Sequence, residues 1–286
     1  MLGGHGFIGR HAVAALNTRG VPVTIGTRTA RLGQGINGEM PIRLEERLRA
    51  SDWCELVAEF DVILNCVGIL RPVRDATYDR IHHQAPSAIA EACTGSRTRF
   101  VHVSALGLGS RDRSGFLTSK RNGEQAIQSF AANWIIVRPS LLDGDGGYGA
   151  AWLRGVARLP IFAVPADARG RIAALMAGDA GLALAQLCLA SDTELGLADS
   201  RIFELGGTQS FIFEQYIRGL RRRYSRRRSI AIPIPGIAAR LAAHVCDLLR
   251  LTPFSFGHWE LLRRDNVPRI NRLPELLGRD PTPVIR

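Results

Sequence analysis

Short apolar runs alternate with segments of helical periodicity over the first 140 residues. A helix with apolar residues at Ile8, Val13 and Leu16 follows an opening run of glycines and stops at Gly20. Four strands are predicted after it, at 21–26, 61–68, 99–107 and 133–140, with helices between them at 49–60, 78–93 and 119–130. Strands that alternate with helices are typical of a parallel sheet covered by helices on both faces.

The pattern loosens after Pro139. A helix near 150–158, a strand at 201–207, a helix at 211–224, an apolar run at 229–235 and an amphipathic helix at 237–251 are predicted there. We therefore expect an α/β chain with a doubly wound domain over 1–140 and a smaller α/β lobe over 141–286. Residues of about 171–207 are expected to return to the first domain's sheet. Such a lobe covers the carboxyl ends of the strands, where doubly wound folds bind ligands.

Gly3, Gly6 and Gly9 form a G-x-x-G-x-x-G pattern where the first helix begins. Glycines let the backbone approach a pyrophosphate, and the free N–H groups of a helix start attract its charge. With Phe7 and Ile8 on the same turn, these residues predict the phosphate loop of a Rossmann-type dinucleotide-binding domain. Only two residues precede this loop, so its first strand looks truncated, and we expect the natural chain to begin upstream with an apolar run.

The end of the second strand bears on which dinucleotide is bound. Asp or Glu commonly holds the ribose hydroxyls there, but this chain has Arg28. An arginine suits a 2′-phosphate, which favours NADP(H) over NAD(H). The alternative is that Arg28 is a solvated surface charge.

Two later segments resemble the extended short-chain dehydrogenase/reductase superfamily. In "HVSALG" and "GFLTSK", Ser104 matches the family's strand-end serine, and Lys120 matches the lysine that holds the nicotinamide ribose. The resemblance implies that these two residues are catalytic. The family's tyrosine, four residues before the lysine, is replaced by Phe116. Loss of a general acid typically lowers the rate about 10²–10⁴-fold. Tyr148 is a weaker candidate source of a hydroxyl.

The segments "ILNCVGILR", "IIVRPSLLDGDGG", "FELGGTQSF" and "LLRRDNVPRINRLPELLG" narrow the resemblance. Together they are similar to the atypical branch related to the nucleotide-binding accessory subunit of respiratory complex I and its bacterial homologues. That branch binds NADP(H) or NAD(H) tightly, often without turnover. The resemblance implies that further residues border the cofactor: Asn65, Val67, Gly68, Pro139 and Ser140.

The formal charge of +11 is concentrated in part between Arg218 and Arg228, which hold seven arginines. We expect this run to be a solvated surface, or a docking site for an anionic membrane or a protein partner together with the 237–251 helix. Nucleic-acid binding is the less favoured reading. The 237–251 helix is also expected to cover the active-site cleft. His82 and His83 are expected to be polar surface or helix-packing residues.

The cysteine spacing and the length of the apolar runs argue against a metal site and a membrane-spanning segment. Five cysteines are scattered without metal-ligand spacing, and no metal is expected. No apolar run is long enough to span a membrane, and a signal-peptide pattern is lacking. We expect a cytoplasmic protein, peripheral at most at the inner membrane.

Three functions stay open. The first is a nucleotide-binding accessory, assembly or redox-sensing factor, motivated by Phe116. The second is an NAD(P)H-dependent reductase or epimerase/dehydratase on a small or quinone-like substrate, motivated by Ser104 and Lys120. The third is an arginine-rich regulator that binds nucleic acid.

Overall fold

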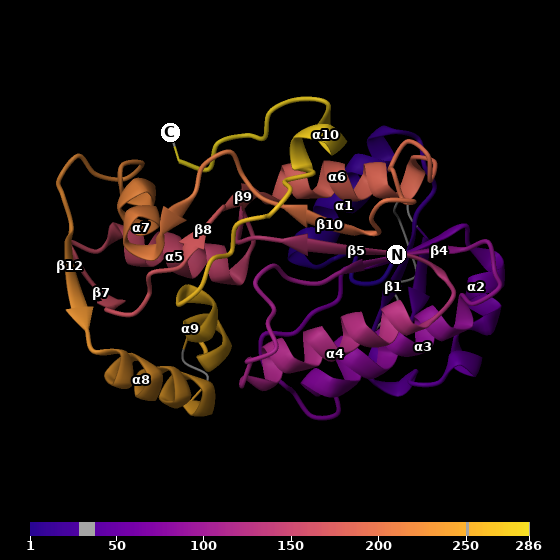
Figure 1. The fold of residues 1–286 in the computed structure, drawn as a ribbon, viewed down its shortest axis with the longest axis horizontal. Coiled ribbons are helices and arrows are strands. Elements are labelled where there is room, and N and C mark those ends of the chain that lie inside the picture. The colour runs from indigo at the N-terminus through magenta and orange to yellow at the C-terminus, as the bar shows by residue number, and fades with distance from the viewer. Residues whose placement is uncertain (29–37, 250–251, 286) are drawn as a thin grey trace.

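A parallel β-sheet forms the centre of the computed structural model, which describes residues 1–28, 38–249 and 252–285 (Figure 1). Every paired neighbour in the sheet runs parallel. Its strands are β1 (Thr24–Thr27), β2 (Gly38–Pro41), β3 (Val62–Asn65), β4 (Arg99–Val103), β5 (Asn133–Pro139) and β10 (Ile202–Leu205). One half has the order β1-β2 and the other β10-β5-β4-β3.

Leu2 joins the two halves of the sheet. It forms parallel bridges to Gly26 and to Asn65. Its amide donates to the carbonyl of Leu64 at 2.8 Å, and its carbonyl accepts from Cys66 N at 3.0 Å. The sheet is therefore continuous from β2 to β10 at the glycine loop, which starts directly after Leu2.

Alternate residues of each central strand pack into two separate cores, which explains the nearly continuous apolar runs. Leu64, Val101 and Ile135 face one core, while Ile63 and Phe100 face the other. The first core is covered by α1 (Phe7–Thr18), α6 (Ala177–Leu189) and α10 (Leu273–Leu277). The second is covered by α2 (Cys54–Glu59), η3 (Arg80–Gln84), α3 (Ala85–Ala92) and α4 (Gly115–Ser129). The predicted doubly wound α/β fold is confirmed.

The remaining elements form a third core beside the carboxyl ends of the main strands. Its helices are α5 (Tyr148–Arg158), α7 (Phe213–Arg221) and α9 (Phe256–Leu262), while α8 (Gly236–Leu249) packs on α9 in a separate small cluster. Its short strands pair as β7 (Ile161–Pro165) with β12 (Ile230–Ile234), β8 (Arg171–Ile172) with β11 (Phe211–Ile212), and β6 (Leu142–Asp143) with β9 (Leu175–Met176). Between them, α6 and β10 return to the main sheet, since Ile202 pairs with Ile136 of β5.

Two segments differ locally from expectation. The predicted helix 49–60 is split into a 3-10 turn, η2 (Ala50–Asp52), and the short α2. The predicted helix 78–93 continues past Pro86, because helical residues run unbroken from 78 to Ala92 through a π-helical turn, η3, and α3. The amide of Ala85 donates to the carbonyl of Arg80 across the π-helical turn, and Pro86, which has no N–H to donate, follows it directly.

Helix α8 does not present its apolar side to the interior. Its buried residues are Ala239 and Ala243, which pack with Phe256 and Trp259 of α9. The bulky aliphatic side chains face solvent, among them Ile237 at 86% and Leu248 at 80% exposure. This exposure does not test the expectation that the helix covers the active-site cleft, which stays a prediction. Residues 250 and 251 of the predicted helix lie outside the described residues.

Candidate functional site

The glycine loop leaves no room for side chains between Leu2 and α1. Gly3 has φ +73°, a conformation that glycine adopts without strain. A Cβ at Gly9 would lie 2.0 Å from the carbonyl oxygen of Gly3, so α1 packs directly on the loop. Gly6 closes the turn by donating to the same oxygen at 2.9 Å. Gly9 is thus required by a backbone contact and Gly3 is favoured by its positive φ, whereas a Cβ at Gly6 would lie 3.1 Å from the Gly3 oxygen.

The amino end of α1 has the features of an anion site. No side chain caps the helix at Gly6, and its first turn holds no acidic residue. The first-turn N–H groups of Phe7, Ile8 and Gly9 therefore remain available to donate hydrogen bonds to a ligand, and the helix dipole adds partial positive charge. Arg10 follows, and its guanidinium donates to the carbonyl of Asp145 at 2.8 Å. This end of α1 fits the pyrophosphate of a dinucleotide.

The end of β3 meets the glycine loop. Asn65 is fully buried, and its side-chain oxygen accepts from Val67 N at 3.0 Å, which turns the chain at the strand end. A Cβ at Gly3 would lie 3.0 Å from a Val67 methyl group. Gly68 follows, and a Cβ there would lie 3.8 Å from the amine of Lys120. Val67 therefore lies beside the glycine loop and Gly68 beside the Lys120 amine, while the buried Asn65 side chain fixes the turn between β3 and these residues.

Lys120 projects from α4 and is 8% exposed. Burial lowers the pKa of its amine to about 8, and the nearby Glu124 carboxylate partly opposes this change. Glu124 itself is only 2% exposed and pairs with Arg138 of β5. The chain's sole lysine is thus a buried amine with a pKa close to neutrality.

Phe116 stands one turn before Lys120, and its ring is packed by aromatic neighbours. The ring centroid of Phe116 lies 5.9 Å from that of Tyr78, 5.6 Å from that of His82 and 5.8 Å from that of His258. The Lys120 amine is 5.8 Å from the same centroid. No hydroxyl therefore occupies this position. The hydroxyl of Tyr78 is engaged, since it donates to the carbonyl of Leu70 at 2.7 Å.

His82, one of the aromatic neighbours of Phe116, is neutral. The amide of Ile69 donates to its Nε2 at 3.1 Å, so Nδ1 carries the proton and donates to Ser119 Oγ at 3.1 Å. Burial, aided by the Lys120 charge, lowers the pKa of His82 well below its ordinary value. The helix-packing alternative for His82 therefore holds and the surface alternative does not. His83, in contrast, pairs with Asp79 at 2.8 Å and is partly exposed.

His258 reaches Phe116 from α9 in the second lobe. Its Nδ1 lies 2.6 Å from Ser255 Oγ, and burial lowers its pKa to about 4. Tyr78 and His258 could not be identified from the sequence, because neither lies in a motif and only the packing of distant segments brings them to the ring of Phe116.

Ser104, Pro139 and Ser140 lie at the ends of β4 and β5. Ser104 is 5% exposed, and its hydroxyl has no hydrogen-bond partner within the described part of the chain. A buried hydroxyl without a partner is uncommon and fits contact with a bound ligand. Ser140 differs, because its hydroxyl donates to the carbonyl of Asn266 at 2.6 Å. Pro139 accepts from Leu106 N at 3.0 Å, which ties β5 to the loop after Ser104.

Arg28 directly follows β1 and is exposed, without a carboxylate partner in the ranges that the structure describes. The segment that follows it, 29–37, lies outside the described residues. Tyr148 is 62% exposed at the start of α5. It follows a loop in which a Cβ at Gly144 or Gly147 would lie 3.4 or 2.7 Å from the Phe7 ring of α1.

Within the described ranges, His, Cys, Asp and Glu side chains do not gather in groups of three that could hold a metal ion. The glycine loop, the uncapped start of α1, the buried Lys120 and the unpartnered Ser104 together fit a dinucleotide. When bound, that cofactor would supply a hydride acceptor or donor at its nicotinamide.

A family model described as NAD(P)H-binding matches residues 3–156. Among curated proteins, the mitochondrial NADH-ubiquinone oxidoreductase 40 kDa subunit of Neurospora crassa is 26% identical over 252 residues, which is 81% of this chain and 64% of that subunit. The ceramide reductase of Caulobacter vibrioides is 27% identical over 275 residues, which is 93% of this chain and 84% of the reductase.

The fold is shared with sugar-nucleotide enzymes of known structure. A nucleoside-diphosphate-sugar epimerase from Staphylococcus aureus superposes with a TM-score of 0.73 at 12% identity, covering 99% of this chain and 96% of that one. MoeE5 in complex with UDP-glucuronic acid and NAD superposes with a TM-score of 0.66 at 15% identity, covering 99% and 93%. At these identities the likeness shows the fold alone.

Proposed function

Because the chain belongs to the NAD(P)H-binding family, as an atypical relative of the short-chain dehydrogenases/reductases, we propose that it holds its dinucleotide with little turnover. It then acts as an accessory, assembly or redox-sensing factor whose partner responds to the bound cofactor. The glycine loop and α1 hold the phosphates, and Lys120 and Ser104 border the nicotinamide ribose.

Phe116 is the observation that carries this proposal. In the superfamily a tyrosine at this position exchanges the substrate proton, and a phenyl ring has no proton to exchange. The rings closest to Phe116 do not supply a substitute, because His82 and His258 are held neutral by burial and the Tyr78 hydroxyl is committed to Leu70. Hydride transfer without proton transfer leaves an alkoxide unprotonated, which costs about 10²–10⁴-fold in rate.

NADP(H) is the proposed cofactor in preference to NAD(H). Arg28 supports this choice, since an exposed guanidinium without a carboxylate partner can pair with a 2′-phosphate in two parallel hydrogen bonds. Its position at the end of β1 is where this fold receives the adenosine ribose.

An enzymatic role is the second candidate function. The Caulobacter vibrioides relative that matches 93% of this chain is named a ceramide reductase, and Ser104 and Lys120 remain in place here. In this alternative the protein is a reductase of a lipid of that class, and water supplies the proton.

The proposal also places the protein in the cytoplasm with a protein partner. Nucleic acid is the less favoured partner, because aromatic residues that would stack on bases do not alternate with the arginines of 218–228, apart from Tyr224. Binding to random duplex that weakens steeply with salt would favour it instead.

The test uses the purified full chain. The dinucleotide that co-purifies is released by denaturation and identified, and the loaded protein is then mixed with aldehydes, ketones, quinones and a ceramide-class ketone. Retained NADP(H) with unchanged nicotinamide absorbance is expected. Rapid oxidation of the bound NADPH by any of these compounds would overturn the proposal in favour of a reductase.

A further inference from the structure

Helix α8 exposes large aliphatic side chains on one side. Ile237, Leu241, Val245, Leu248 and Leu249 are 86%, 65%, 43%, 80% and 55% exposed, respectively. At 3.6 residues per turn these positions fall within an arc of about 120°. The opposite side is small, with Ala239 and Ala243 buried against α9. An amphipathic helix normally buries its bulky side, so this orientation calls for an apolar partner.

The two-stranded sheet that leads into α8 is apolar on its outer face as well. Ile230 of β12 pairs with Ile161 of β7, and Ile232 pairs with Ala163. All four side chains are exposed, with Ile230 at 62%, Ile161 at 50% and Ile232 at 48%. Because paired residues share a face, they form a continuous exposed strip. Figure 1 shows β12 descending along one edge of the molecule directly into α8.

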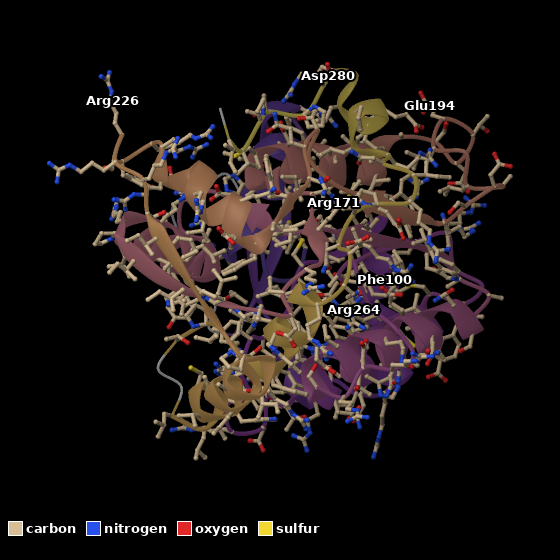
Figure 2. The ribbon with its side chains drawn as sticks, turned by 60° about the vertical axis from the view of Figure 1, so that its left-hand side comes forward. Phe100, Arg171, Glu194, Arg226, Arg264 and Asp280 are labelled. Carbon is tan, nitrogen blue, oxygen red and sulfur yellow. The ribbon has the colours of Figure 1, made fainter. Side chains whose placement is uncertain are left out.

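Unpaired arginines stand at the other end of β12. Between Glu214 and Asp247 the sequence holds eight arginines and no acidic residue. In the part of the chain that the structure describes, Arg222, Arg226, Arg227 and Arg228 are exposed and form no ion pair with a carboxylate. Figure 2 shows Arg226 extending away from the body of the molecule.

One arginine of the run instead fixes the loop. Arg221 is 7% exposed, and its guanidinium donates to the carbonyls of Arg158 and Leu159 at 2.9 and 2.7 Å and to that of Arg227 at 2.9 Å. The exposed arginines are thereby held on a tethered loop beside β12. Arg158 also lies over the ring of Tyr224, at 4.5 Å from its centroid, and adds a cation and an aromatic ring to this end.

We propose that the loop 222–228, the outer face of β7 and β12, and the exposed side of α8 form a docking surface for an anionic phospholipid bilayer. The arginines pair with lipid phosphates, and the aliphatic side chains enter the headgroup and acyl boundary. None of the helices in the described ranges is long and apolar enough to cross a membrane, so the contact is peripheral. This inference goes beyond the proposed function and does not depend on it.

Charge complementarity selects a membrane over the other occupants. A second copy of the chain, paired through the same surface, would offer the arginines no carboxylate between Glu214 and Asp247. Nucleic acid would satisfy the arginines but leave the aliphatic side of α8 in water. An anionic bilayer meets both requirements, since it offers phosphates above an apolar layer.

Flotation of the full chain with vesicles tests the proposal. Vesicles of phosphatidylcholine alone are compared with vesicles that also contain phosphatidylglycerol, at low and high salt. We expect flotation with the anionic vesicles only, weakened by salt because exposed charges are screened. The triple variant Arg226→Gln/Arg227→Gln/Arg228→Gln should bind on the order of 100-fold more weakly, at about fivefold per arginine near an anionic surface.

Matched controls separate this surface from general charge and hydrophobicity. The control variant Arg97→Gln/Arg111→Gln/Arg113→Gln removes three exposed arginines outside this surface, and so changes the net charge by the same amount. Its binding to anionic vesicles should stay within about threefold of wild type. Leu241→Ser/Leu248→Ser should weaken binding at least about tenfold. Val73→Ser/Ile270→Ser, at sites 52% and 73% exposed, should not.

All variants are checked for unchanged circular dichroism and for NADPH binding. Equal flotation with both kinds of vesicle, no flotation, or equal losses in the surface and control variants would each overturn the proposal. So would a dimer in solution that Leu241→Ser/Leu248→Ser converts to a monomer, because the surface would then bind a second copy.

Discussion

The buried amine of Lys120 makes the stability of the protein depend on pH in a predictable direction. Burial lowers its pKa from 10.5 to about 8 in the folded protein, whereas the unfolded chain keeps the ordinary value. Between these two values the unfolded state binds more protons than the folded state. The free energy of unfolding contributed by this group therefore rises with pH from about 8 to about 10.5.

The magnitude follows from the same two values. The difference between 10.5 and about 8 corresponds to roughly 3 kcal/mol at about 1.4 kcal/mol per pH unit. Lys120 is 8% exposed, so solvent screens this effect little. At pH 7, where the amine is charged in both states, the protein carries the full cost of burying that charge.

Lys120→Met removes the charge and keeps a similar length of side chain. We expect the variant to be more stable than wild type by up to roughly 3 kcal/mol at pH 7, with a difference that shrinks as the pH rises above 8. His82 and His102, whose pKa values are lowered by burial first and by the Lys120 charge second, are neutral in the folded state of both proteins at pH 7 and above. The difference between the two proteins therefore reports Lys120.

Urea unfolding followed by circular dichroism at a series of pH values measures the two stabilities. Because Lys120 is the only lysine, ¹³C-lysine labelling gives a single ε-carbon signal whose titration reports the pKa of the amine directly. A midpoint near 10.5, together with parallel stability curves for the two proteins, would refute the reasoning and place the amine in water.

Two further substitutions test the site. Gly9→Ala places a Cβ 2.0 Å from the Gly3 oxygen and should weaken NADPH binding at least about tenfold in a fluorescence titration. The control Gly155→Ala, with no neighbour within 4 Å, should bind NADPH normally and gain about 0.5–1 kcal/mol in free energy of unfolding, measured with urea. Wild-type affinity of Gly9→Ala for NADPH would contradict the loop contact. Arg28→Gln should lower affinity for NADPH roughly tenfold and leave that for NADH unchanged, since it removes one charged hydrogen-bonding partner of a 2′-phosphate; equal losses for both cofactors would assign Arg28 no role in the choice between them.

The parallel sheet could be predicted from the sequence because its strands are apolar on both faces, which leaves a run such as 61–68 nearly without polar residues. The phosphate loop could be predicted for a similar reason, since Gly9 has no substitute where two backbone segments touch. The ends of the helices and strands were harder to predict from the sequence. Strand β3 stops at Asn65 because that side chain captures the amide of Val67, a contact that the apolar pattern does not encode.

Contacts between distant segments could not be predicted. The apolar side of the 237–251 helix was recognised, but periodicity gives only the existence of such a side and not the direction it faces. Packing of two alanines on α9 decides that direction. In the same way, the sequence showed that Phe116 replaces a tyrosine, whereas the contact of its ring with His258 depends on how the second lobe folds back over α4.

The central claim, that the site binds a dinucleotide and lacks only the proton donor, is tested most directly by Phe116→Tyr. Wild type, Phe116→Tyr and the control Phe116→Leu are loaded with NADPH deuterated at the transferable position and mixed with the same carbonyl panel, and deuterium in the product is measured. The claim predicts equal NADPH binding by all three and about 10²–10⁴-fold faster transfer by Phe116→Tyr alone. Transfer by Phe116→Tyr no faster than by wild type would contradict it.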